Sequence, residues 1–412
     1  MTLRSTLLLG ALLFAVPIAA QEAPEPPLAP PTVAPERIVL NLAADPAHAM
    51  AVTWRSAAGL PGMVELAQAG DGPDFVKTAA RLPARTDDAT IAVRETPALH
   101  AAYHSLTMTG LKPDTTYAYR VGDGTHWSEW LQFHTAAATA RPFRFLYVGD
   151  MQNQILSEAS RTLRMGLRMA GDAAFVVNGG DLVNRHDSDA EWGEWFAAGG
   201  YAYGQTPQMP TPGNHEYGHG LVLNLQWQRQ FTLPANGPAG LARLSDTCWS
   251  TDYQGMRLIS IDAPQLEGVP ESREAIVKWL EPLLARNPNR WTVMVLHFPL
   301  YSLEPQRDNV QVRHALKPLI DKYKVDLVLQ GHDHGYGRGM VGPDGPGKPG
   351  KGATYIVAVA GPKMYDGGIG TWARKSATKT QTYQVIDVSD HEMVYRAYTA
   401  AGRLLDETIL RK

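Results

Sequence analysis

Short runs of apolar residues alternate with stretches of helical pattern in the chain from residue 143 onward. Such runs predict buried strands, and the alternation predicts a sheet covered by helices. The predicted strands span residues 143–148, 173–177, 256–261, 292–296, 325–329 and 354–359. The predicted helices span residues 157–171, 190–198, 271–286 and 313–324. The stretch from Gly337 to Gly352 is rich in Gly and Pro and is predicted to be a long loop.

Residues 37–136 have a different pattern of short β-rich runs separated by turn signals. The runs lie at 38–42, 50–54, 101–108 and 116–121, and Lys112-Pro-Asp114 is one of the turn signals. About a hundred residues of this kind predict an immunoglobulin-like or fibronectin-like β-sandwich.

The N-terminus has the pattern of an export signal. Residues 1–20 combine Arg4, an apolar run and small residues at the end, and this run is too short for a typical membrane-spanning helix. We expect a signal peptide and a secreted or periplasmic protein with no stable membrane span after cleavage. A retained anchor is the alternative. Residues 21–36 contain six prolines and are predicted to be an extended linker.

Composition narrows the chemistry. The chain has 412 residues and a formal net charge of -3, which argues against nucleic-acid binding because that normally requires a basic surface. Its one cysteine, Cys248, excludes an intramolecular disulfide and a thiolate metal cluster. A bound metal would therefore need oxygen and imidazole ligands. The sequence does not indicate an oligomeric state.

Several predicted strands run directly into acids, amides or histidines. These residues are Asp150, Gln152, Asp181, Asn214, His215, His297, His332 and His334. In layered α/β folds ligands gather at the carboxyl ends of strands, so we expect one common site. Carboxylates and imidazoles suit iron, manganese and zinc. Three His, two Asp and one Asn are too many for one tetrahedral ion and suit two ions that share a carboxylate.

The motif series resembles that of the calcineurin-like metallophosphoesterases. The matching segments are Gly149-Asp150, Gly180-Asp181, Gly213-Asn214-His215-Glu216, His297 and Gly331-His332-Asp333-His334. With the preceding sandwich, the closest resemblance is to purple acid phosphatases. It implies a fibronectin type III-like domain at 37–136, a four-layered αββα catalytic domain at 141–400 and a C-terminal tail at 401–412.

The same resemblance implies a role for each residue. Asp181 bridges two metal ions, Fe, Mn or Zn, while Asp150 and His334 hold the first ion. Asn214, His297 and His332 hold the second ion. His215 acts as the proton donor, and a metal-bound hydroxide is the implied nucleophile.

Two positions depart from the purple enzymes. Asn184 stands where they have a metal-binding tyrosine, so we predict a protein without the purple colour. We also hypothesise that the Asn184 side chain accepts a hydrogen bond from His215, as an aspartate does in the similar Ser/Thr protein phosphatases. Gln152 stands where the purple enzymes have glycine, and its carbonyl is a weak candidate ligand.

The implied function is hydrolysis of a small phosphate ester, in the manner of an acid phosphatase acting on monoesters. A phosphodiesterase or phospholipase-type enzyme on the same metals is the first alternative. An exported binding or adhesion module with a degenerate metal site is the second. His219, Tyr301 and Tyr336 are candidates for the substrate pocket, with ordinary structural roles as the alternative. Lys363 is a surface lysine by default but lies in Gly361-Pro-Lys-Met-Tyr365, where it could meet phosphate.

Overall fold

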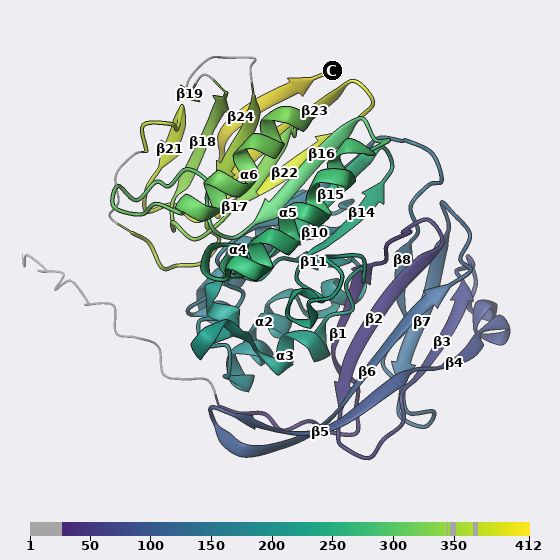
Figure 1. Cartoon of the computed structure of the whole chain (residues 1–412). Helices are drawn as coiled ribbons and strands as arrows, with labels where there is room; N and C mark the ends of the chain where they lie inside the picture. Colours follow the sequence, from purple (N-terminus) through teal and green to yellow (C-terminus); the bar gives the residue numbers. More distant parts are fainter. Residues whose placement is uncertain (1–26, 344, 347–351, 366–369) are drawn as a thin grey trace, which may run out of the picture.

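The computed structural model describes residues 27–343, 345–346, 352–365 and 370–412 (Figure 1). The predicted signal peptide and the first part of the predicted linker lie outside the described residues. The described chain forms an N-terminal β domain followed by a larger α/β domain, as the sequence predicts. Across these described ranges, no helix has the length and apolar character needed to cross a membrane.

The N-terminal domain consists of two antiparallel sheets of four strands each. One sheet has the order β1 (Glu36–Leu42), β2 (Ala49–Ser56), β6 (Thr96–Thr109) and β5 (Arg85–Val93). The other has the order β4 (Ala80–Pro83), β3 (Met63–Gln68), β7 (Thr116–Gly122) and β8 (Leu131–His134), with the short helix η1 (Pro73–Thr78). Strand β2 is buried along its whole length. Its Val52 and Trp54 join the apolar core, whereas Thr53 donates a hydrogen bond to the Gln230 carbonyl of the α/β domain at 2.7 Å.

The α/β domain is built on two sheets. The first has six strands in the order β11 (Gln208–Pro210), β10 (Val176–Asn178), β9 (Phe143–Val148), β22 (Thr382–Val388), β23 (Glu392–Thr399) and β24 (Leu404–Arg411). The second has eight strands, with the path β14 (Trp249–Tyr253), β15 (Met256–Ile261), β16 (Trp291–Leu296), β17 (Leu327–Gln330), β20 (Ala353–Val357), β18 (Tyr336–Gly342) and β19 (Gly345–Pro346). Strand β21 (Lys375–Ala377) pairs with β18. Strands β9 to β11 are parallel, as are β15, β16, β17 and β20.

Helices lie over the eight-stranded sheet in Figure 1, and α1 (Ser160–Met169) contacts the six-stranded sheet. Helix α1 contacts β9 and β22, α2 (Asp189–Gly199) contacts α1 and β1, and the π-helical turn Ile155–Ala159 precedes α1. Helices α4 (Ala263–Gly268), α5 (Pro270–Ala285) and α6 (Val310–Tyr323) cover the other sheet, while α3 (Leu225–Gln230) contacts β2. The smaller elements are η3 (Gly200–Gly204), η4 (Asn214–Glu216), β12 (Tyr217–Gly218), η5 (His219–Leu221), β13 (Val222–Leu223) and η6 (Ala242–Leu244).

Alternation along the central strands explains the four layers. In β16, Val293 and Val295 belong to the core between the two sheets. Met294 and Leu296 point the other way, into the core beneath α5 and α6. Successive side chains of a strand point to opposite faces, so a strand that is apolar throughout is buried on both. This arrangement confirms the predicted αββα fold.

Two predictions about the C-terminal part are wrong. Residues 337–342 of the predicted loop 337–352 belong to β18, whose glycines pack closely: a Cβ at Gly339 would overlap the Trp372 carbonyl. These glycines allow tight packing within a strand rather than marking a loop. Residues 344 and 347–351 of this loop lie outside the described residues. The predicted tail 401–412 contains β24, which pairs with β23 along the sheet edge. The sequence of this segment lacks a clear apolar strand pattern because β24 is an edge strand, and many of its side chains are exposed to solvent.

Candidate metal centre

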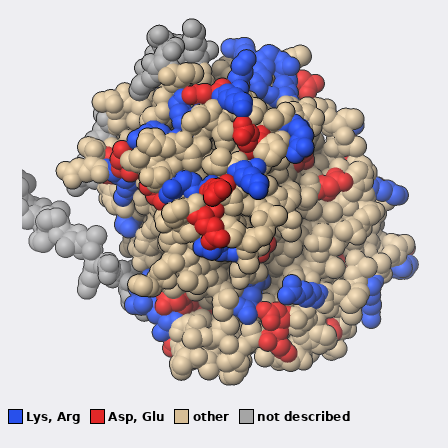
Figure 2. Space-filling view, viewed as in Figure 1, with Lys and Arg blue, Asp and Glu red and all other residues tan. Residues whose placement is uncertain are grey.

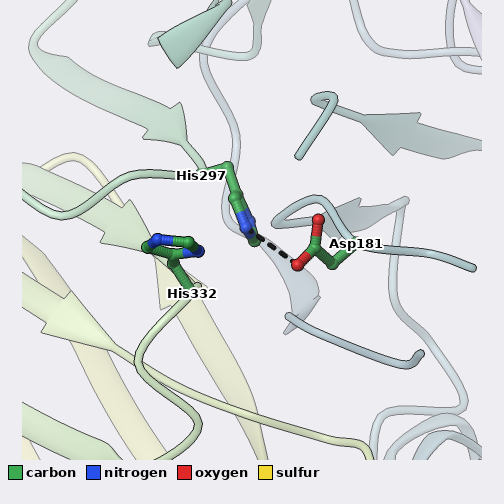
Figure 3. A group of neighbouring side chains, drawn as sticks. All are labelled: Asp181, His297 and His332. Carbon is green, nitrogen blue, oxygen red and sulfur yellow. Dashed lines mark ion pairs between the residues drawn. The ribbon is translucent and has the colours of Figure 1, made fainter. Parts of the chain in front are cut away.

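The ends of strands from both sheets bring the predicted ligands together. Asp150 follows β9, Asp181 follows β10, Asn214 follows β11, His297 follows β16, and His332 and His334 follow β17. Two groups of possible ligand atoms lie within 4.8 Å of one another: Asp181 with His297 and His332, and Asp150 with Asp181 and His334. Figure 3 shows His297 and His332 side by side, with His297 directed at Asp181. Asp181 is common to both groups, as a bridging ligand would be.

Four of the predicted metal ligands have a left-handed backbone conformation. The φ angles are 49° at Asp150, 52° at Asp181, 73° at His332 and 43° at His334. Non-glycine residues rarely adopt this conformation, and such residues cluster at functional sites. The neighbouring Gly213 is also required, because a Cβ there would overlap the Asp181 carboxylate. The backbone conformation at these positions is therefore unusual and specific to this site.

Carbonyl groups orient the histidines. His297 Nδ1 lies 2.8 Å from the Gly179 carbonyl, and His334 Nδ1 lies 2.8 Å from the Lys363 carbonyl. Since a carbonyl only accepts, each Nδ1 must carry hydrogen, and each Nε2 faces the centre. His297 Nε2 is 3.1 Å from Asp181, and His334 Nε2 is 3.5 Å from Asp150. This outer support is typical of metal-binding histidines.

Burial and neighbouring charge set the protonation of the centre. Burial raises the pKa of Asp150 well above its ordinary value. Burial lowers the pKa of His332 to about 2 and that of His334 to about 4, which leaves both as neutral imidazoles near pH 7. Burial opposes the charge of His297, but Asp181 outweighs it and raises the His297 pKa to about 9. Asp181 therefore attracts positive charge in this pocket.

The donor set fits metal ions. The Asn214 Oδ1 and Gln152 Oε1 atoms are buried and have no hydrogen-bond partner. A buried oxygen without a partner is costly, and a cation would satisfy it. The described residues provide imidazole nitrogens together with carboxylate and amide oxygens, which suit Fe, Mn or Zn.

Gln152 makes a hydrogen bond inside the centre. Its Nε2 donates to Asp181 Oδ2 at 2.7 Å and lies 3.2 Å from His334 Nε2. This hydrogen bond uses the amide nitrogen and leaves Oε1 without a partner, so the weak carbonyl ligand stays a prediction, while Gln152 also donates to Asp181.

His215 lies in η4 at the edge of the centre, with 26% of its side chain exposed. Its backbone N–H donates to Asp181 Oδ1 at 2.9 Å, and its Nε2 is 4.0 Å from Asp181 Oδ2. Its Nδ1 lies 2.6 Å from the backbone carbonyl of Asn184. The hypothesis that the Asn184 side chain orients His215 is therefore wrong, because the main chain supplies the acceptor.

Two buried glutamates support this region, and the sequence analysis missed their roles. Glu216 accepts hydrogen bonds from the backbone N–H groups of Asp181, Leu182 and Gly213. Burial raises the Glu216 pKa to about 7. Glu191 accepts from the N–H groups of Asn184 and Arg185 at 2.8 and 2.7 Å. The position of Glu216 directly after Asn214-His215 was a usable signal, whereas nothing local identifies Glu191.

The proposed pocket residues lie in different environments. His219 is exposed in η5, and Tyr301 is half-buried against Tyr355. Their roles remain predictions. Tyr336 is fully buried, and its hydroxyl donates to Asp406 at 2.7 Å. The prediction that Tyr336 borders the substrate is wrong, because none of its ring reaches the surface.

The sequence analysis also missed two aromatic rings beside Gly331-His332-Asp333-His334, which we call the GHDH motif. The Phe298 ring lies 4.5 Å from the His332 ring between centroids. Tyr365 stacks on His334 at 4.4 Å with an interplanar angle of 17°. Both contacts join positions that no local pattern connects.

Comparison with known proteins gives the family. The model of the purple acid phosphatase N-terminal domain matches residues 35–135, and the model of the calcineurin-like phosphoesterases matches residues 143–336. Residues 143–336 therefore form a calcineurin-like metallophosphoesterase domain, preceded by a domain of the purple acid phosphatase N-terminal type. The family inferred from the sequence motifs is thus confirmed, including the likeness to purple acid phosphatases.

The curated relatives of this chain are distant. Mouse acid phosphatase type 7 is 26% identical over 351 residues, which cover 75% of this chain and 71% of the mouse protein. An uncharacterized protein of Mycobacterium tuberculosis is 28% identical over 267 residues, which cover 56% of this chain and 49% of that protein. The chain thus spans about half the length of the mycobacterial relative.

Solved structures show the same fold. The purple acid phosphatase PPD1 from yellow lupin seeds has a TM-score of 0.72 at 20% identity, covering 92% of this chain and 74% of the lupin chain. The structure of PhoD has a TM-score of 0.65 at 12% identity, covering 93% of this chain and 90% of the PhoD chain. Both comparisons extend over the sandwich and the α/β domain together.

Proposed function

We propose that this protein hydrolyses phosphate esters, as an acid phosphatase-like phosphomonoesterase, at two ions of Fe, Mn or Zn. The observation that carries the proposal is the presence of Asp181 in both ligand groups. Asp150, Asp181 and His334 would hold one ion. Asp181, Asn214, His297 and His332 would hold the other.

Two such ions, when bound, supply Lewis acidity and neutralise charge on the phosphoryl group. The protein side chains would hold the ions and transfer a proton. The buried carboxylates fix the centre, and His215 stands at its exposed edge. Water attacks phosphorus, the ester P–O bond breaks, and His215 Nε2 gives its proton to the departing oxygen. His215 Nδ1 keeps its own hydrogen because the Asn184 carbonyl continues to accept it.

The test is a metal analysis of purified protein paired with an assay on an aryl phosphate. We expect about two metal ions per chain and measurable hydrolysis. His215→Ala should lower kcat by about 10²-fold or more, because the leaving oxygen loses its proton donor, while metal content stays unchanged. His48→Ala, which alters an exposed histidine of the sandwich, is the matched control.

The alternatives give distinct results. A diesterase would prefer a bis-aryl phosphate to an aryl phosphate. A binding module with a degenerate site would hold less than about one metal ion per chain. Unchanged turnover in His215→Ala would remove His215 from its proposed role. We also propose that the protein is exported, which N-terminal sequencing of the mature protein would test. We further propose that it is not purple, because Asn184 stands where the purple enzymes have a metal-binding tyrosine. Its absorbance spectrum should then lack a tyrosinate band.

A further inference from the structure

The segment from Gly361 to Tyr365 borders the centre on the His334 side. The Lys363 carbonyl accepts a hydrogen bond from His334 Nδ1 at 2.8 Å. Two residues later the Tyr365 ring stacks on the His334 ring. The segment is thus joined to a proposed metal ligand by its main chain and by an aromatic contact. The Lys363 and Tyr365 side chains are both half-buried, so part of each reaches solvent beside the centre.

Two cationic side chains lie near the Tyr365 ring, and they differ in their partners. The Arg307 guanidinium is 5.5 Å and the Lys363 ammonium 5.8 Å from the ring centroid. Arg307 is engaged by Asp333 at 2.6 Å and by the His332 carbonyl at 2.9 Å. Among the described residues, by contrast, no carboxylate pairs with Lys363, whose ammonium group lies over the Tyr365 ring. Lys363 is therefore the cation available to an incoming anion.

The protein needs such a local charge. Its formal net charge is -3, and basic and acidic side chains are interspersed on the face in Figure 2. The overall field therefore gives little attraction for a phosphate ester, so nearby cations must provide it. A monoester carries up to two negative charges on its phosphoryl group, whereas a diester carries one. A fixed ammonium group stabilises the dianion more, because the interaction scales with charge.

We propose that Lys363, positioned by Tyr365, binds a nonbridging phosphoryl oxygen of the substrate and makes the site prefer monoesters to diesters. This role rests on the proposed function. It also makes Lys363 a substrate-binding residue, distinct from the ligands and from His215.

The structure permits a clean test. His334 is held by the main-chain carbonyl of Lys363, so replacing the side chain leaves that support in place. Lys363→Gln should weaken binding of inorganic phosphate, measured by calorimetry on the metal-loaded protein, by about tenfold. It should lower kcat/KM for an aryl phosphate by about tenfold but lower that for a bis-aryl phosphate by less than about threefold. Lys363→Arg should restore most of the preference, and metal content should not change.

Lys322→Gln is the matched control. Lys322 also lies over a tyrosine ring, Tyr323, at 4.9 Å, but on α6 in the outer helix layer. This variant should leave phosphate binding and both kcat/KM values at wild-type levels.

Three results would overturn the role of Lys363. These are unchanged phosphate binding in Lys363→Gln, an equal loss for monoester and diester, or a loss of metal together with phosphate binding. Failure of the wild-type protein to hydrolyse either ester would instead reject the proposed function. The calorimetric comparison of wild type and Lys363→Gln would still test whether Lys363 binds phosphate.

Discussion

At the scale of single residues, Asp181 organises the centre. Its carboxylate takes part in both ligand groups and accepts hydrogen bonds from Gln152 and from the His215 backbone. Its own N–H is held by Glu216 at 2.9 Å, and its left-handed φ is possible because Gly213 leaves room beside it. The adjacent ends of β10 and β11 therefore place Asp181, the proposed bridging ligand, next to His215, the proposed proton donor.

The backbone contact of His215 leads to a prediction about Asn184. Asn184→Ala and Asn184→Asp should each keep kcat within about threefold of wild type, in contrast to the loss of 10²-fold or more expected for His215→Ala. The reason is that the Asn184 main-chain carbonyl accepts the His215 hydrogen and survives both changes. Steady-state kinetics over a range of pH would check this. A shifted pH–rate profile in Asn184→Asp would show that the side chain acts on His215 after all.

At the scale of elements, β24 closes the six-stranded sheet and also supports β18 of the other sheet. Asp406 on β24 accepts a hydrogen bond from Tyr336 and pairs with Arg338 at 2.6 Å. Asp406 and Tyr336 are buried, and only 14% of the Arg338 side chain is exposed. The last strand of the chain thus connects the two sheets behind the GHDH motif.

This contact predicts unequal effects for neighbouring residues of β24. Asp406→Ala should lower the free energy of unfolding by about 3 kcal/mol, because Arg338 and the Tyr336 hydroxyl lose their partner in a buried setting. Glu407→Ala removes an exposed pair with Arg396 and should cost less than about 1 kcal/mol. Urea denaturation of the two variants would check the contrast. Equal costs would mean that β24 does not brace β18 through Asp406.

At the scale of the whole molecule, a buried charge cluster joins the sandwich to the α/β domain. Asp189, the first residue of α2, pairs with Arg37 at 2.8 Å and with Arg55 at 2.7 Å. The three side chains are 0%, 6% and 1% exposed. Glu95 of the sandwich also accepts a hydrogen bond from Ser188, the residue that caps α2. The sandwich therefore holds the start of the helix that carries Glu191, the support of the Asn184 loop.

Loss of this cluster should destabilise the protein strongly. Asp189→Ala should lower the free energy of unfolding by about 3–5 kcal/mol, because buried Arg37 loses its counter-charge and buried Arg55 keeps only the more exposed Glu36. Asp87→Ala is the matched control, since Asp87 makes a more exposed pair with Arg229 across the same two domains and should cost less than about 1 kcal/mol. Calorimetric unfolding would compare them, and a small effect of Asp189→Ala would show that the cluster does not hold the domains together.

The sequence by itself determined the apolar strands, a sheet covered by helices and the polar residues at the strand ends. Such features are local, because the period of a strand and the residue after it are written in neighbouring positions. Asp150, Asp181 and the histidines of the GHDH motif were predictable for this reason. Strands β18 and β24 were not predictable from the sequence. In β18 glycines replace apolar side chains where the chain packs tightly, and in β24 many side chains are exposed at the sheet edge.

Only the tertiary structure decided which groups meet. His215 is oriented by a carbonyl 31 residues away, and His332 donates to Asp150 across 182 residues. The Tyr336 hydroxyl donates to Asp406 of β24, and the segment of Lys363 and Tyr365 contacts His334 through a main-chain carbonyl and a stacked ring. Each of these contacts joins segments that are far apart in the sequence, so the periodicity of neighbouring residues cannot predict them.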